Sequence, residues 1–353
     1  MVTALRYAAS LPNGSDLTEL DQLKRRSFIT LLGGVLAAWP LAARAQQRER
    51  MRRLAVLMPY PEGDAEVQVE VAAFREQLQK LGWTQGRNLL IDYRWPGDQV
   101  GRIHAAAKEL VALQPDAILV RSTPVTRALM QETRAIPIVF LMVSDPVGDG
   151  LIANFANPGS NVTGFTNAEA SLGGKWIELL KEIAPGLQRL GALTNPKTAP
   201  GRGAYYEGSV ESAAASMGLK LVTAVVESPA DIQQAIDSFA REPNGGLLVL
   251  PDLTTATHRA QIIALAAPHR LPAVYGIKFY ATEGGLMSYG ADPTDLYRRS
   301  ATYIDRVLRG EKPGALPVQA PVKFELVINL KTAKALGLDV PWFLQQRADE
   351  VIE

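Results

Sequence analysis

Two hydroxyl side chains, Ser122 and Thr123, lie where a short apolar run ends and a helical pattern opened by Pro124 begins. Backbone N–H groups in the first turn of a helix have no partner within the helix, and proline suits that turn because it has no N–H to lose. Hydroxyl groups beside such N–H groups attract a carboxylate or another anion. The sequence therefore predicts an anion-binding position at Ser122 and Thr123. A helix cap at Thr123 is the structural alternative, and the two roles are compatible because a bound carboxylate itself caps the helix.

Other polar and aromatic residues also follow apolar runs. Asp145 and Asp252, each next to a proline, could receive an ammonium group, or they could cap helices and form turns. Tyr60 and Tyr275 could provide flat apolar walls with a polar tip, or they could pack half-buried at strand ends. The whole set predicts a ligand site formed by Tyr60, Ser122, Thr123, Ser144, Asp145, Asn195, Asp252 and Tyr275.

Catalytic and cofactor motifs are not found in this sequence. The chain has no cysteine, which excludes disulfides, thiolate nucleophiles and zinc–cysteine sites. Its three histidines, His104, His258 and His269, are not at metal-ligand spacing. There is no P-loop and no Gly-x-Ser-x-Gly elbow, and Tyr206 stands where a dinucleotide fingerprint begun by Gly201-Arg-Gly203 needs its third glycine. We expect a binding protein without metal or cofactor; a hydrolase that uses Asp145 and Asp252 is the remote alternative.

The elements that must position the site residues alternate along the chain from Arg52 onward. Short apolar runs predict strands at 54–58, 89–93, 117–120, 138–141, 189–194, 219–226, 246–250, 272–275, 285–290 and 324–328. Amphipathic patterns predict helices at 64–81, 98–113, from 124, and at 171–184, 203–217, 230–240, 256–268, 294–309 and 331–336. Such alternation predicts an α/β fold with parallel sheets and helices on both faces. Ligands bind such sheets beyond the carboxyl ends of the strands, where all the predicted site residues fall.

The strands form two similar blocks, which predicts two Rossmann-like lobes. A turn-rich passage at 144–168 separates the blocks and indicates a domain crossing. We expect residues 52–164 plus about 291–320 in the first lobe, and residues 165–290 plus about 321–340 in the second. Residues 341–353 are expected to be a C-terminal tail, and the last portion of the chain is expected to cross between the lobes again.

Residues 24–47 predict where the protein works. A basic Lys24-Arg25-Arg26 segment precedes an apolar run, Phe28–Leu41, that is too short to span a bilayer, and Ala43-Arg44-Ala45 offers a peptidase site. Residues 1–45 are therefore interpreted as an N-terminal extension and export signal peptide. The Arg-Arg-Ser-Phe order favours a twin-arginine (Tat) signal, with a general secretory signal or a short buried helix as alternatives. Because no cysteine can carry a lipid anchor, we expect a soluble periplasmic protein.

The net charge limits the classes of partner that the protein can bind, and the chain length indicates how many domains it has. Removing residues 1–45 takes away five basic and three acidic residues, so the formal net charge falls from +1 to −1. A near-neutral chain without basic clusters argues against nucleic acid or a membrane surface as partner. The remaining chain of about 300 residues exceeds what one compact core usually holds, which agrees with two lobes.

Several blocks of sequence resemble one known family, the solute-binding components of ABC importers often labelled tryptophan/tyrosine transport substrate-binding proteins. The blocks are 25–34, Ser144-Asp-Pro-Val147, 157–165, 284–290 and 323–337. The resemblance covers nearly everything from Lys24 to Glu353. It implies a type I periplasmic-binding fold, in which two lobes joined by three crossings close on a ligand. It also implies that the loop holding Ser122 and Thr123 receives the ligand carboxylate.

The resemblance and the residues together predict a monomeric periplasmic solute-binding protein of an ABC importer. It would capture an amino acid or a related aromatic or carboxylate metabolite and deliver it to an inner-membrane permease. The carboxylate would meet residues 122–124, the ammonium Asp145 or Asp252, and Tyr60 or Tyr275 would cover the side chain. Crossings near 164, 290 and 320 would absorb the hinge motion. The alternative is a periplasmic ligand sensor that feeds a receptor kinase or another transport system.

Overall fold

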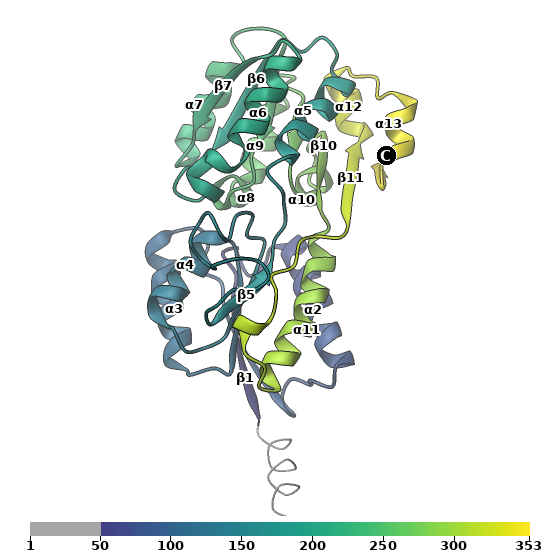
Figure 1. Ribbon diagram of the computed structural model, residues 1–353. Helices are drawn as coiled ribbons and strands as arrows, with labels where there is room; N and C mark the ends of the chain where they lie inside the picture. The colour runs from purple at the N-terminus through teal and green to yellow at the C-terminus, as the bar shows by residue number, and fades with distance from the viewer. Residues whose placement is uncertain (1–50) are drawn as a thin grey trace, which may run out of the picture. The chain divides into compact units, whose positions relative to one another are not determined.

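A computed structural model describes residues 51–353 of the chain (Figure 1). The predicted export signal lies outside these residues. Two sheets organise the described part, and we call each sheet with its covering helices a lobe. No helix in this part is long and apolar enough to cross a bilayer.

Lobe 1 is built on five parallel strands in the order β2-β1-β3-β4-β5. The strands are β1 (Arg52–Leu57), β2 (Leu89–Arg94), β3 (Ala117–Arg121), β4 (Ile138–Leu141) and β5 (Val162–Phe165). Four of its helices are α2 (Ala65–Lys80), α3 (Val100–Ala112), α4 (Thr123–Glu132) and α11 (Pro293–Leu308). One face of the sheet packs on α2 and α11 and the other on α3 and α4, as Figure 1 shows. Because both faces are covered, the strands β3 and β4 are buried along their whole length, which explains why they are apolar except for Arg121 at the end of β3.

Lobe 2 is built on seven strands in the order β12-β11-β10-β9-β8-β6-β7. The strands are β6 (Arg189–Thr194), β7 (Lys220–Val225), β8 (Gly245–Val249), β9 (Ala273–Tyr275), β10 (Met287–Ala291), β11 (Phe324–Asn329) and β12 (Glu350–Ile352). The pairing is parallel except between β10 and β11. The larger helices are α5 (Leu172–Ile183) and α6 (Ala204–Ser216) against one face, and α7 (Pro229–Phe239) and α9 (Arg259–Ala266) against the other.

Shorter helical segments complete the described chain. They are α8 (Leu253–Thr257), α10 (Lys278–Thr282), α12 (Leu330–Leu336), α13 (Trp342–Arg347), η1 (Pro200–Gly203) and η2 (Pro313–Ala315). Of these, α8 matters most for the site, because it begins directly after strand β8 at the edge where the two lobes meet.

Three passages of chain join the lobes: β5 to α5, β10 to α11, and η2 to β11. The passages are tied to one another. The Thr166 N–H donates to the Gln319 carbonyl at 2.9 Å, and the Lys323 ammonium donates to Asp292 at 3.0 Å. The predicted fold class, two Rossmann-like lobes with parallel sheets and three crossings, is confirmed.

Two strands, β5 and β12, were not predicted from the sequence. Strand β5 lies inside the turn-rich passage 144–168; it has only four residues, and one is Gly164, whose added Cβ would sit 2.2 Å from the Phe140 carbonyl. The glycine therefore permits close pairing rather than marking a turn. The tail at 341–353 contains α13 and the strand β12, which pairs with β11. The helix expected at 256–268 is divided at His258 into α8 and α9.

Candidate ligand-binding site

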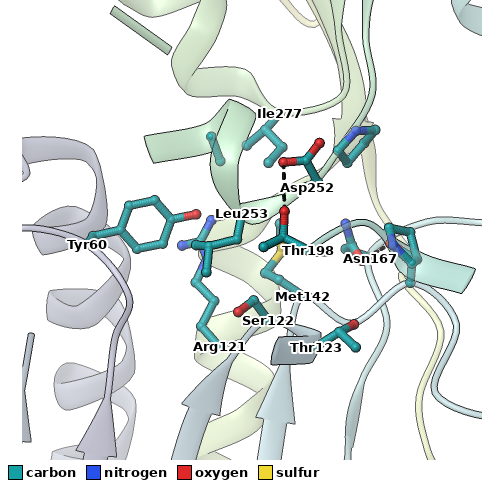
Figure 2. Close-up of a pocket in the computed structure, with 14 residues that line it drawn as sticks. Tyr60, Arg121, Ser122, Thr123, Met142, Asn167, Thr198, Asp252, Leu253 and Ile277 are labelled. Atoms are coloured by element: carbon teal, nitrogen blue, oxygen red, sulfur yellow. Dashed lines mark hydrogen bonds between the residues drawn. The ribbon is translucent and has the colours of Figure 1, made fainter. Parts of the chain in front are cut away.

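A cavity of about 40 Å³ lies between the carboxyl ends of the strands of the two lobes. From lobe 1 it is lined by Tyr60, Arg121, Ser122, Thr123, Met142 and Ser144. From the first crossing and lobe 2 it is lined by Asn167, Thr198, Pro200, Pro251, Asp252, Leu253, Ala256 and Ile277. Figure 2 shows Ser122 and Thr123 near the end of a strand, with Asp252 and Ile277 on the opposite side. The cavity is thus lined by polar and apolar side chains in similar numbers, and both lobes contribute to each kind.

Ser122 precedes helix α4 in an unusual backbone conformation. Its φ is 78° and its ψ is 155°, a region that residues with a Cβ rarely adopt. Ser122 is the N-cap residue, yet its side chain makes no capping hydrogen bond, and its Oγ is buried without a partner in the described structure. No side chain therefore caps the N–H groups of Thr123 and Val125 in the first turn of α4, where Pro124 has no N–H. Strain of about 1–3 kcal/mol at such a residue is commonly kept for function.

Arg121, the last residue of β3, lines the cavity although it was not among the predicted site residues. Its side chain is 1 % exposed and pairs with the buried Glu70 of α2. The guanidinium carbon lies 4.8 Å from the ring centre of Tyr60, and Nη1 donates to the Tyr297 hydroxyl at 3.4 Å. Nη2 is buried and has no partner in the described structure. One feature of the sequence could have indicated Arg121: it is a charged residue at the end of an otherwise apolar run.

Burial affects the pKa of both members of this ion pair. Burial raises the pKa of Glu70 to about 6, and the attraction of Arg121 offsets only part of that effect. Burial also lowers the pKa of Arg121, but Glu70, Tyr60 and Tyr297 together outweigh that effect and leave the pKa of Arg121 above its ordinary value. The cavity therefore has a permanent positive group in its lobe 1 wall.

Asp252 occupies the opposite wall as the N-cap of α8. Its Oδ1 accepts from the Thr255 N–H at 2.8 Å and from the Thr198 hydroxyl at 3.2 Å. Its Oδ2 accepts from the Asn195 N–H at 2.9 Å. Burial raises the pKa of Asp252 to about 6, although these hydrogen bonds oppose the shift. Asp252 is the single acidic residue of the cavity lining.

The remaining predicted residues divide into two groups. Tyr60 and Ser144 line the cavity, and the Ser144 Oγ accepts from the Tyr206 hydroxyl of lobe 2 at 3.1 Å. Asp145, Asn195 and Tyr275 lie outside the lining. Asp145 accepts from the Gly148 N–H at 2.8 Å, and Asn195 donates to the Thr254 hydroxyl at 2.8 Å. Tyr275 is buried in the core, stacked on Tyr280 at 4.3 Å.

The structure therefore brings five predicted residues to one cavity, namely Tyr60, Ser122, Thr123, Ser144 and Asp252. Nine further lining residues were not predicted: Arg121, Met142, Asn167, Thr198, Pro200, Pro251, Leu253, Ala256 and Ile277. Most of these nine lie within a few residues of a strand end, as the five predicted residues do. Within residues 51–353, no group of three histidine, aspartate or glutamate side chains is placed to hold a metal ion.

Side chains of the two lobes also contact each other outside the cavity lining. Arg259 of α9 reaches Asp64, the N-cap of α2 in lobe 1, at 2.8 Å, and it also pairs with Glu283 at 2.6 Å. Asp98 of lobe 1 meets the Thr257 hydroxyl at 3.0 Å and the His258 imidazole at 3.2 Å. These polar contacts join the lobes directly, in addition to the three crossings.

Comparisons with known proteins agree with this architecture. A "Tyrosine-binding protein" of Clostridioides difficile is 26 % identical over 266 residues, which is 75 % of each chain. A crystal structure of a conserved domain protein from Vibrio cholerae has a TM-score of 0.79 at 29 % identity, covering 86 % of this chain and 100 % of that chain. An ABC domain from Streptococcus pneumoniae in complex with L-Trp has a TM-score of 0.78 at 24 % identity, with the same coverage.

The sequence signature described as "ABC transporter substrate binding protein" matches residues 55–352, almost the entire described chain. The match spans both lobes and every residue that lines the cavity. This chain therefore belongs to the family of ABC transporter substrate-binding proteins.

Proposed function

We propose that this protein is the periplasmic solute-binding component of an ABC importer, and that it captures a small carboxylate-bearing metabolite, an amino acid or an aromatic acid. It would act as a monomer without cofactor or catalysis, and it would deliver its ligand to an inner-membrane permease. The observation that carries the proposal is the cavity itself, because strand ends of two separate lobes supply its walls. Relatives described by their tyrosine or L-Trp ligand support the ligand class.

In this proposal, different residues of the cavity lining bind different parts of the ligand. The ligand carboxylate meets Ser122, Thr123 and the free N–H groups at the start of α4. An ammonium group, where the ligand has one, faces Asp252, the single carboxylate of the lining. The apolar body packs against Tyr60, Leu253 and Ile277, which are all buried.

Loading the site requires the lobes to separate. A cavity of about 40 Å³ has room for only a few water molecules, which is less than an amino acid needs. The three crossings are the segments that can absorb a change of backbone angle between the lobes. Binding would then act by shifting the population of open and closed forms toward the closed one, which the permease would recognise.

A ligand panel tests this function. We expect thermal-shift measurements with amino acids, aromatic acids, sugars and nucleosides to show stabilisation by at least one carboxylate. Calorimetry should then give a 1:1 complex, and the ligand should be recovered chemically unchanged after incubation. Absence of stabilisation by every member of the panel would refute solute capture of this kind, and turnover of the ligand would refute the non-catalytic role.

A further inference from the structure

Two neighbouring residues of the cavity lining have donors that the described structure leaves unused. Of the fourteen lining residues, only Arg121 and Ser122 have a buried side-chain nitrogen or oxygen without a hydrogen-bond partner: Nη2 of Arg121 and Oγ of Ser122. A buried donor without a partner costs free energy, and most proteins leave few of them. Two such donors on consecutive residues of one cavity wall indicate that something else supplies the acceptor.

Contacts with neighbouring side chains fix the guanidinium of Arg121 and leave its Nη2 without a partner in the described structure. Glu70 pairs with Nη1, and Tyr297 is within reach of the same nitrogen. The rings of Tyr60 and Tyr297 lie 4.8 and 5.7 Å from the guanidinium carbon. An arginine that is fixed in this way loses little side-chain entropy when it binds a further group, which makes its free N–H an efficient donor.

A purely structural ion pair does not explain this arrangement. Burying two charges costs desolvation, and a well-packed apolar pair of similar volume is often at least as stable. A structural pair would also have no use for the unpartnered Nη2, nor for the strained backbone that places the hydroxyl of Ser122 beside the cavity. Both features are explained if an acceptor with two oxygens binds there.

We propose that Arg121 determines the charge specificity of the cavity: its Nη2 and the Ser122 hydroxyl together bind one carboxylate of the ligand, and Glu70 is the positioning residue that orients the guanidinium. This inference rests on the proposed function and deepens it. A carboxylate fits because it is planar, accepts hydrogen bonds at both oxygens and has a single charge to set against the guanidinium. The site should therefore bind acids and reject the corresponding amines.

Matched acid and amine pairs test the proposal on the full chain. The pairs are L-tryptophan with tryptamine, L-tyrosine with tyramine, and 3-phenylpropionate with 3-phenylpropylamine, measured by calorimetry. We expect at least one acid to bind, with a Kd at least about tenfold below that of its amine. The double variant Glu70→Gln/Arg121→Gln, which leaves no buried charge unpaired, should weaken acid binding about 10- to 100-fold and bring the acid-to-amine ratio close to one.

Further variants separate specificity from folding. Ser122→Ala should weaken acid binding about three- to tenfold without changing amine binding. Glu70→Gln alone should lower the acid-to-amine ratio although the charge of Arg121 remains, because the guanidinium is no longer oriented. A loss of stability alone would change both affinities and leave their ratio constant.

Arg189→Gln is the matched control. It removes another largely buried arginine, which lies 4.5 Å from the Phe239 ring centre and pairs with Glu242 away from the cavity, so the ratio should not change. Equal binding of acids and amines, or an unchanged ratio in the double variant, overturns the proposal. If sugars or nucleosides bind and none of the acids does, the charge specificity is wrong while solute capture stands; if nothing binds, solute capture itself is wrong.

Discussion

Arg121 and Ser122 show at the scale of single residues how an α/β sheet accommodates a polar site in an apolar interior. The charge of Arg121 is tolerated because Glu70 and two tyrosine rings surround it. Ser122 retains a backbone conformation that glycine would adopt freely. Each residue thus costs stability in the described structure, and in our proposal each gains an acceptor when a ligand binds.

Replacing Ser122 with glycine should separate stability from binding. Relief of the strained φ of 78° should outweigh the added freedom of the unfolded chain, so we expect the free energy of unfolding to rise by about 1 kcal/mol. Carboxylate binding should weaken, because the hydroxyl is lost. Urea unfolding and calorimetry measure the two effects.

Ser238→Gly provides the control for that substitution. Ser238 is exposed in the helix α7, where glycine should destabilise by about 0.5 kcal/mol. If Ser122→Gly also destabilised the protein, the backbone at this position would not be strained.

At the scale of elements, the site depends on where helices begin. Helix α4 begins at the cavity without a side-chain cap, so its first N–H groups have no side-chain acceptor. Helix α8 begins on the other side with Asp252 as a complete cap, tied also to the Asn195 N–H and the Thr198 hydroxyl. One helix start is therefore suited to binding, and the other chiefly fixes the opposing wall.

The cap of α8 should respond to pH. The pKa of Asp252 in the folded protein is about 6, above its ordinary value of 3.8, because the carboxyl is buried. The folded state therefore favours the protonated form. The resulting stability is present below pH 3.8 and is lost as pH rises through 6.

We expect Asp252→Asn to lack this dependence. Between about pH 4 and pH 7, the free energy of unfolding of the wild type should fall relative to the variant by on the order of 2 kcal/mol. Denaturant titrations at both pH values measure the difference, in which contributions of other groups cancel. A constant offset between the two proteins would show that Asp252 is ionised throughout this range.

At the scale of the whole described chain, Arg259 joins the lobes at a point away from the crossings. It binds Asp64 across the lobes, it pairs with Glu283 in its own lobe, and its guanidinium lies 4.5 Å from the Phe279 ring centre. Because Arg259 and Asp64 are both largely buried, their contact is screened less by salt than a surface pair would be.

Loss of this contact should favour separated lobes. We expect Arg259→Gln to increase the radius of gyration of the ligand-free protein in small-angle X-ray scattering and to weaken ligand binding by about tenfold. Lys197→Gln, which breaks the exposed pair between Lys197 and Glu227 within lobe 2, is the control and should change neither quantity. An unchanged radius and affinity in Arg259→Gln would mean that this ion pair does not stabilise the closed form.

The alternation of apolar runs and amphipathic patterns was enough to predict the α/β class, the two lobes and ten of the twelve strands within residues 51–353, because these depend on local periodicity. Strand β5 was not predicted, since four residues containing a glycine give no periodic signal and the pairing with β4 supplies the stability. Strand β12 depends in the same way on its partner β11.

The candidate site, like the fold, could be predicted from the sequence only in part. The rule that ligands bind beyond the carboxyl ends of strands leads from the sequence to Tyr60, Ser122, Thr123, Ser144 and Asp252. Only the tertiary structure decided which strand-end side chains face the cavity: it placed Tyr275 in the core and Asn195 behind the lining, and it turned Arg121 to the cavity with Glu70 as its partner. The direction of a side chain at a strand end depends on what packs against it from distant parts of the chain, and the spacing of residues along the sequence does not contain that information.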